Sequence, residues 1–188
     1  DLRTEELRDT IERQVIHTSR MLDDLLDVAR ISSGKIQLKK QRRDFRDIVR
    51  QTVEDHRESF DDSAVRLELY LPDQPVPVMG DRTRLSQMLG NLLHNACKFT
   101  ETGGAVTVKL QTENLGAAAA LSVMDTGVGM EPEALGWVFE PFRQVDRTLD
   151  RSRGGLGLGL ALVKGIAQLH GGEVAASSDG LGRGSTFT

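Results

Sequence analysis

Three short clusters of small and polar residues constrain the fold of this chain more than any other feature. Residues 91–99 read NLLHNACKF, residues 125–129 read DTGVG, and residues 154–159 read GGLGLG. Glycines allow tight turns and close backbone approach, while amide, carboxylate and ammonium groups contact polar ligands. We expect a fold that brings the three clusters together around one pocket.

The first cluster lies on a segment with helical periodicity. Asn91, Asn95 and Lys98 are spaced at i, i+4 and i+7, so they share one helix face. The opposite face carries the apolar residues Leu85, Met88, Leu89, Leu92, Leu93 and Ala96. Asn95 can offer a neutral oxygen to Mg²⁺, and Lys98 can offer a point charge to phosphate. A solvated helix face that carries two asparagines by chance would show the same spacing.

The second cluster follows a run of strand character, residues 120–124, and places Asp125 at the strand end. A carboxylate at that position can accept a hydrogen bond from an exocyclic amino group such as that of adenine. Gly127 and Gly129 leave room for a flat base. A plain turn between a strand and a helix is the alternative, because the pattern D-x-G-x-G is common.

The third cluster precedes an amphipathic segment, residues 160–169. Glycine-rich backbone that runs into a helix N-terminus is an anion site, because free N–H groups and the positive end of the dipole both face the ligand. A dinucleotide-binding motif would sit early in the chain, directly after the first strand. We therefore expect a hinged lid, which would include the basic residues Arg143, Arg147, Arg151 and Arg153.

In this order and spacing, the clusters resemble the ATP-binding half of a sensor histidine kinase, in the superfamily that also holds gyrase, Hsp90 and the mismatch-repair ATPases. Residues 91–99 are similar to its N box, 125–129 to its G1 box, 139–142 to its F box and 155–159 to its G2 box. Residues 182–187 resemble the turn that closes the adenine pocket.

The resemblance implies ATP and Mg²⁺ as ligands. It implies that Asn95 binds the metal, Lys98 the phosphates and Asp125 the adenine amino group, with Asn91, Asn95 and Lys98 as the catalytic residues. The implied nucleotide-binding residues are Asn91, Asn95, Lys98, Phe99, Asp125, Gly127, Gly129, Phe142, Gly155, Leu156, Gly157, Leu158, Gly159 and Ser185.

Asn91 discriminates within the superfamily. The ATP-hydrolysing members carry a glutamate there as general base, whereas an amide takes no proton at neutral pH. We therefore expect transfer of the γ-phosphoryl group to a presented side chain, by positioning and charge neutralisation. Gln144 stands where many histidine kinases carry a phosphate-binding arginine, so which lid arginine meets the γ-phosphate stays open. A non-catalytic nucleotide-sensing or scaffold module is the alternative function.

The N-terminal segment is predicted to be one long bundle helix, residues 5–31, with apolar residues at alternating spacings of four and three. It resembles the second helix of the dimerisation and phosphoacceptor hairpin, so residues 1–34 are expected to form part of that unit. The resemblance implies a homodimer and a response regulator receiver domain as partners. His17 lacks the acidic neighbour of the acceptor histidine, which belongs to the first helix of the hairpin, and none of His17, His56, His94 and His170 is expected to accept phosphate.

Composition adds few constraints. The chain has 188 residues, a formal net charge of −4 and one cysteine, Cys97, so it can form no internal disulfide. The mild acidity argues against nucleic-acid binding. No apolar run reaches the ~18 residues of a membrane span, and no signal peptide is recognisable. We expect a cytoplasmic module, attached to a membrane only through upstream segments.

The fold class is predicted to be α+β. Residues 35–188 should form a two-layer α/β sandwich with a mixed sheet and a nucleotide lid, preceded by the bundle helix. Asp44 and Asp81 are expected to cap helices. Strands are expected at 36–38, 65–71, 105–112 and 118–124, a turn at 72–77, and from 172 a final hairpin whose last strand is truncated. The nucleotide would lie between the helices and the lid.

Overall fold

A five-stranded mixed sheet, covered on one face by helices, forms the body of the molecule. The computed structural model describes residues 2–113, 118–144 and 156–188. The strands are β2 (Arg66–Tyr70), β4 (Ala105–Glu113), β5 (Ala118–Asp125), β7 (Ser185–Phe187) and β6 (Ala176–Ser177), in that spatial order. Strand β2 is parallel to β4, and the other neighbours are antiparallel.

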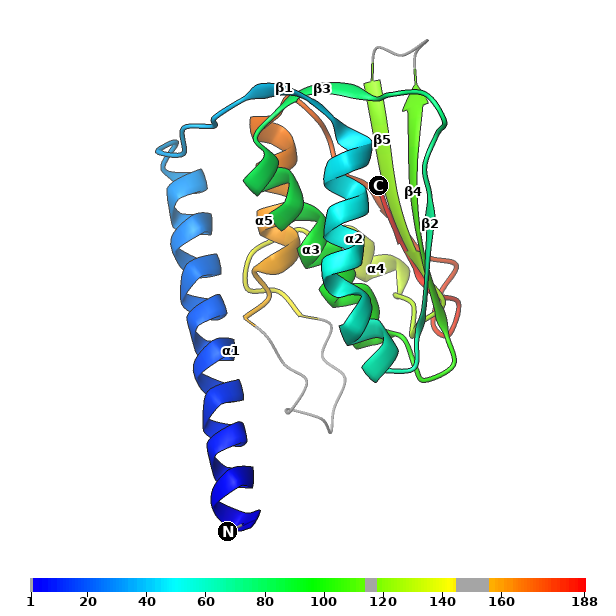
Figure 1. Ribbon diagram of the computed structural model, residues 1–188. Coiled ribbons are helices and arrows are strands. Elements are labelled where there is room, and N and C mark those ends of the chain that lie inside the picture. The colour runs from blue at the N-terminus through cyan, green and yellow to red at the C-terminus, as the bar shows by residue number, and fades with distance from the viewer. Residues whose placement is uncertain (1, 114–117, 145–155) are drawn as a thin grey trace.

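The helical layer consists of α2 (Phe45–Asp62), α3 (Arg82–Phe99) and α5 (Gly159–Leu169), with the short α4 (Pro132–Leu135) beside it. These helices lie on one side of the sheet in Figure 1. Apolar residues of α2 and α3 pack onto the alternating inward residues Val106, Val108 and Leu110 of β4. The predicted α+β class and two-layer sandwich are confirmed.

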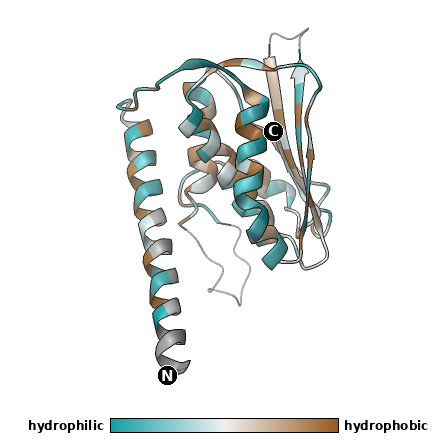
Figure 2. Ribbon diagram, viewed as in Figure 1, coloured by the Kyte–Doolittle hydropathy of each residue, from teal (hydrophilic) through white to brown (hydrophobic). Residues whose placement is uncertain are grey.

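Helix α1 (Leu2–Ser32) extends away from this body (Figure 1). Its C-terminal part contacts the helical layer: Ile31 packs against Gly165 of α5, and Asp27 bonds to Arg84 and Gln87 of α3. The hydropathy colouring of Figure 2 shows apolar residues along α1, of which Ile11 and Val15 are exposed. None of the described helices is long and apolar enough to cross a membrane.

Both predicted helix caps are present. The Asp44 side chain accepts from the Arg46 N–H at 3.1 Å, and the Asp81 side chain accepts from the Arg84 N–H at 3.3 Å. Each cap satisfies a backbone donor that has no partner inside the helix. The expected boundaries of α2 and α3 follow from these residues.

Three expectations about the connections were wrong or incomplete. Residues 36–38 form no strand: Ile36 and Leu38 are half-buried and Gln37 is exposed, so an irregular segment with one side covered produces the alternation. The strand is β1 (Gln41–Asp44), which pairs with β3 (Pro77–Gly80) in a separate antiparallel ribbon. Strand β3 and helix α4 were not predicted, and Pro77 begins a strand rather than ending the turn, a position that proline tolerates.

Candidate nucleotide site

The polar face of α3 opens onto a large hollow beside α5. Asn91, Asn95 and Lys98 are half-buried and line it, whereas Leu89 and Leu93 of the same helix are completely buried in the core. The predicted division of this helix into a polar and an apolar face is therefore present. His94 is exposed and also lines the hollow.

The N-terminus of α5 meets this polar face. Asn91 Nδ2 donates to Gly159 O at 3.5 Å, and a Cβ placed on Gly159 would lie 3.9 Å from Asn95 Nδ2. The N-cap residue Leu158 has no polar side chain and makes no capping hydrogen bond, so within the described residues the N–H groups of the first turn of α5 keep their capacity to bind an anion. Two amides and a positive helix end thus converge within a few ångströms.

Asp125 is the last residue of β5, and only 7% of it is exposed to solvent. Its Oδ1 accepts from the Gly127 N–H at 2.8 Å. Burial raises the pKa of Asp125, and hydrogen bonds from backbone N–H groups of Gly127 and Ser185 oppose that rise. A buried carboxyl whose hollow-facing side is open can accept from an amino group of a ligand.

The loop after Asp125 is held by the turn at 180–184. Gly182 N–H donates to Val128 O at 2.8 Å. Gly129 has φ +66°, and a Cβ there would lie 2.0 Å from Gly180 O, so only glycine fits. This close contact between two backbone segments fixes the floor of the pocket.

Lys98 supplies the cationic group. Burial lowers the pKa of its ammonium group, and Nζ lies 4.8 Å from the centroid of the Phe99 ring. No carboxylate of the described residues forms an ion pair with it. A desolvated cation without a carboxylate partner is suited to a phosphate ligand.

The two ends of the predicted lid lie together. Phe142 N–H donates to Gly157 O at 3.1 Å, and a Cβ on Gly157, whose φ is +69°, would lie 2.7 Å from Arg143 O. Arg143 bonds to Glu140 at 2.8 Å and stacks over the ring of Trp137. Arg147, Arg151, Arg153 and Gly155, with the body of the predicted lid, lie outside the described residues.

Most of the predicted site residues share one hollow. Those that line it are Asn91, Asn95, Lys98, Phe99, Asp125, Gly129, Leu156, Gly157, Leu158, Gly159 and Ser185. Gly127 is buried behind the loop, and Phe142 is exposed without lining the hollow. Sequence reasoning missed an apolar wall of the hollow. It consists of Met130, Trp137, Val138 and Phe187. Only Trp137 and Val138 adjoin the F box in sequence, so no single local pattern marked the wall.

The side chains that line the hollow suit a metal ion that is also coordinated by a bound ligand. Among the described residues no group of three or more His, Cys, Asp or Glu side chains could hold a metal by itself. Asn95 offers one neutral oxygen, which fits Mg²⁺ because that ion usually keeps waters and phosphate oxygens in its shell.

Comparison with known proteins places the chain in a family. Residues 80–188 match the family model described as histidine kinase-, DNA gyrase B- and HSP90-like ATPase. The chain is 36% identical over 174 residues to the circadian input-output histidine kinase CikA of Synechococcus elongatus, covering 92% of this chain and 23% of CikA. It is 37% identical over 172 residues to the histidine protein kinase DivJ of Caulobacter vibrioides, covering 92% of this chain and 28% of DivJ.

Solved structures give the same grouping. The histidine kinase AdeS of Acinetobacter baumannii has a TM-score of 0.78 at 25% identity, over 97% of this chain and 82% of that chain. Full-length ShkA, solved in complex with AMPPNP, has a TM-score of 0.81 at 29% identity, over 97% of this chain and 37% of that chain. The chain spans about a quarter of the length of CikA and DivJ. The resemblance to sensor histidine kinases of two-component systems is confirmed, and the chain belongs to the histidine kinase-, DNA gyrase B- and HSP90-like ATPase family.

Proposed function

We propose that this chain binds ATP and donates its γ-phosphoryl group to a histidine presented by another helix. The observation that carries the proposal is that the polar face of α3, Asp125 and the N-terminus of α5 border one hollow. Asp125 would accept from the adenine amino group, Lys98 would neutralise phosphate charge, and the first turn of α5 would bind the phosphates through its N–H groups.

Asn95 would hold Mg²⁺ together with phosphate oxygens. When bound, the metal would neutralise charge on the phosphates. The three polar residues of α3 are fixed on one rigid helix, and Asn91 is held by its hydrogen bond to Gly159 O, so their positions are set before the nucleotide arrives. Asn91 and Asn95 cannot remove a proton from water at neutral pH, which favours transfer over hydrolysis.

The acceptor would approach over the outer surface of α3. The hollow that contains Asn95 continues to Asp27 and Arg30 of α1, so α1 and the nucleotide residues border one space. We assign residues 1–34 to the second helix of a dimerisation and phosphoacceptor hairpin, and residues 35–188 to the catalytic ATP-binding unit. The exposed Ile11, Val15 and Leu22 of α1 fit helix packing in a homodimer.

The phosphoryl group would then pass to an aspartate of a response regulator receiver domain. The names of the relatives, which are sensor kinases, support this assignment. ATP as substrate favours a cytoplasmic location. His17 is not the acceptor in this proposal, because Thr18 and not an acidic residue follows it.

A labelling experiment tests the proposal. The chain is incubated with Mg²⁺ and γ-labelled ATP, first alone and then with a polypeptide that carries a phosphoacceptor histidine on a helix able to pair with α1. We expect acid-labile label on the added polypeptide and none with Asn95→Ala. Label at His17 of the isolated chain would contradict the proposal. ATP binding without any transfer would favour the non-catalytic alternative.

A further inference from the structure

The connection between α1 and α2 carries an unusual concentration of positive charge. Residues 35–43 contain five cations and no acidic residue, although the whole chain has a net charge of −4. All five are exposed, and we call them the basic strip: Lys35, Lys39, Lys40, Arg42 and Arg43. Such a concentration creates a local positive potential that attracts a partner of opposite charge.

No carboxylate within the described part of the chain forms an ion pair with the basic strip. The nearest acidic groups already have partners. Asp44 bonds to Arg46, and Asp81 accepts from the backbone N–H groups of Lys39 and Arg84. Arg43 donates to Gln41, which is neutral. The positive charge of the basic strip is therefore not cancelled inside the protein.

The β1–β3 ribbon presents this charge beside an apolar side chain. Arg42 lies opposite Met79 in the antiparallel register, so their side chains are on the same face of the ribbon. Met79 is 61% exposed. The other face packs on α3 at Gly80, where a Cβ would lie 2.5 Å from Leu85, although Arg43 on that face stays exposed. The outward face thus combines the Arg42 guanidinium with a flexible thioether, and the remaining cations are exposed along the same short segment.

The ribbon runs along one end of the molecule, level with the C-terminal end of α1 (Figure 1). Figure 2 shows β1 as a hydrophilic segment at this outer edge. Backbone pairing in β1 and the bond between Lys39 N–H and Asp81 hold the segment in place, so its backbone does not have to be ordered on binding. A linear edge of cations suits an extended flat surface better than a compact concave partner.

From this geometry we infer that the basic strip binds the surface of an anionic lipid bilayer. Clusters of four to eight Lys and Arg residues bind anionic headgroups, and the attraction acts within about a Debye length of the surface. Met79 would enter the interfacial region beside them. Lys39 borders the hollow that contains Asn95, whereas Lys40, Arg42, Arg43 and Met79 do not line it, so a test at positions 40, 42 and 43 is independent of the proposed phosphoryl transfer.

Vesicle sedimentation tests the inference. The probes are vesicles of phosphatidylcholine alone and of phosphatidylcholine with phosphatidylserine. The test variant is Lys40→Glu with Arg42→Glu and Arg43→Glu. The matched control, Arg66→Glu with Lys109→Glu and Lys164→Glu, makes the same change of net charge at exposed positions elsewhere. A second triple variant, with glutamine at positions 40, 42 and 43, is used if the first fails to fold.

The wild-type chain is expected to bind the phosphatidylserine vesicles at least tenfold more strongly than the neutral ones, and to be released by added salt. The test variant should bind them about 100-fold more weakly, and the control should bind like the wild type. An equal loss of vesicle binding in the test variant and in the matched control would show a general charge effect and overturn the inference. Binding to an acidic protein or to nucleic acid, without binding to anionic vesicles, would also overturn it.

Discussion

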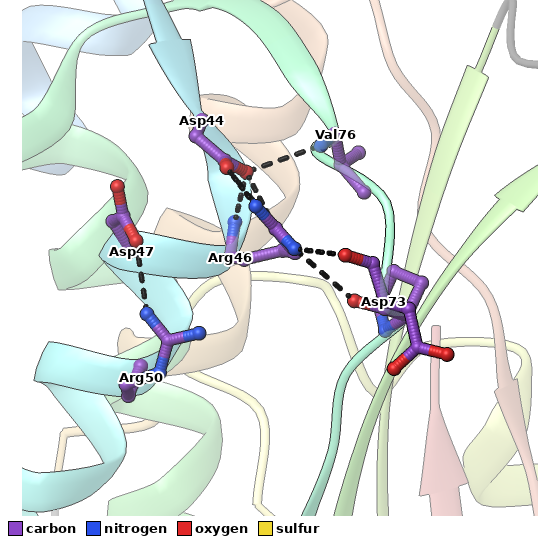
Figure 3. Close-up of polar contacts among 7 residues, drawn as sticks. Asp44, Arg46, Asp47, Arg50, Asp73 and Val76 are labelled. Atoms are coloured by element: carbon purple, nitrogen blue, oxygen red, sulfur yellow. Dashed lines mark hydrogen bonds and ion pairs between the residues drawn. The ribbon is translucent and has the colours of Figure 1, made fainter.

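Asp44 offers a quantitative test of how the N-terminus of α2 is held. Its carboxylate accepts from the Val76 N–H at 3.1 Å and pairs with Arg46 Nη2 at 2.7 Å (Figure 3). Arg46 Nη1 in turn donates to Asp73 O at 2.6 Å. One ion pair therefore connects the start of α2 to the turn between β2 and β3.

The pKa of Asp44 gives the size of the effect. Hydrogen bonding to the Arg46 guanidinium lowers this pKa from 3.8 to about 2. A shift of this size corresponds to at most roughly 2.5 kcal/mol of unfolding free energy. Because a folded-state pKa below the unfolded value stabilises the ionised form, the contribution is complete above pH ~5 and is lost as the pH falls toward 2.

We predict that Asp44→Asn lowers the free energy of unfolding by about 1–2 kcal/mol at pH 7. The value lies below the upper limit because both side chains retain some exposure and asparagine still caps the helix. The matched control is Asp47→Asn, which removes the exposed ion pair with Arg50 and should cost less than about 0.5 kcal/mol. Urea unfolding, followed by the fluorescence of Trp137, measures both between pH 7 and pH 3.

The wild-type advantage over Asp44→Asn should shrink across that pH range. Equal stability of the two asparagine variants at pH 7 would show that the ion pair of Asp44 with Arg46 contributes no more than the exposed pair of Asp47 with Arg50. A difference that does not change with pH would show that the ionised form of Asp44 is not what stabilises the fold.

Two further predictions concern the attachment of α1 and the floor of the pocket. Asp27 is 8% exposed, and although burial alone would raise its pKa, hydrogen bonds from Arg84 and Gln87 lower it overall. Asp27→Ala should release α1, seen as faster amide exchange in α1 with an unchanged sheet, whereas Asp23→Ala at an exposed position should not. Gly129→Ala should destabilise the fold by about 1–3 kcal/mol and weaken ATP binding, because the new Cβ would lie 2.0 Å from Gly180 O. The control is Gly136→Ala, where φ is −66° and the nearest atom to a Cβ is 3.7 Å away; it should change neither stability nor ATP binding.

Local chemistry predicted much of the fold. The caps Asp44 and Asp81 and the period of 3.6 in residues 85–96 determined α2 and α3, because both signals act within a few residues of sequence. The alternation at 36–38 was misleading, since a period of two also arises when an irregular segment lies on a surface with one side covered.

Long-range contacts were beyond such reasoning. The contact of Gly129 with Gly180 joins two backbone segments that are far apart in sequence, so no local sequence pattern predicts it. The burial of Asp27 depends on how α1 lies against α3, whereas its sequence position suggested only a bundle helix. The gathering of Asn95, Asp125 and Gly159 around one hollow was predictable only from the order and spacing of all three clusters.

The proposed function requires that Asp125 recognises adenine in a pocket that binds ATP with Mg²⁺. Calorimetric titration of the wild type, Asp125→Asn and the exposed control Glu131→Gln with ATP and with GTP measures this recognition. We expect the wild type and the control to bind ATP and to discriminate against GTP. In Asp125→Asn the amide oxygen can still accept from the Gly127 N–H, but an NH2 donor replaces the second carboxylate oxygen and would face the adenine amino group. This mismatch should weaken ATP binding by about 1–3 kcal/mol and reduce the discrimination. Equal ATP affinity of Asp125→Asn and the wild type, with both proteins folded, would show that Asp125 does not recognise adenine.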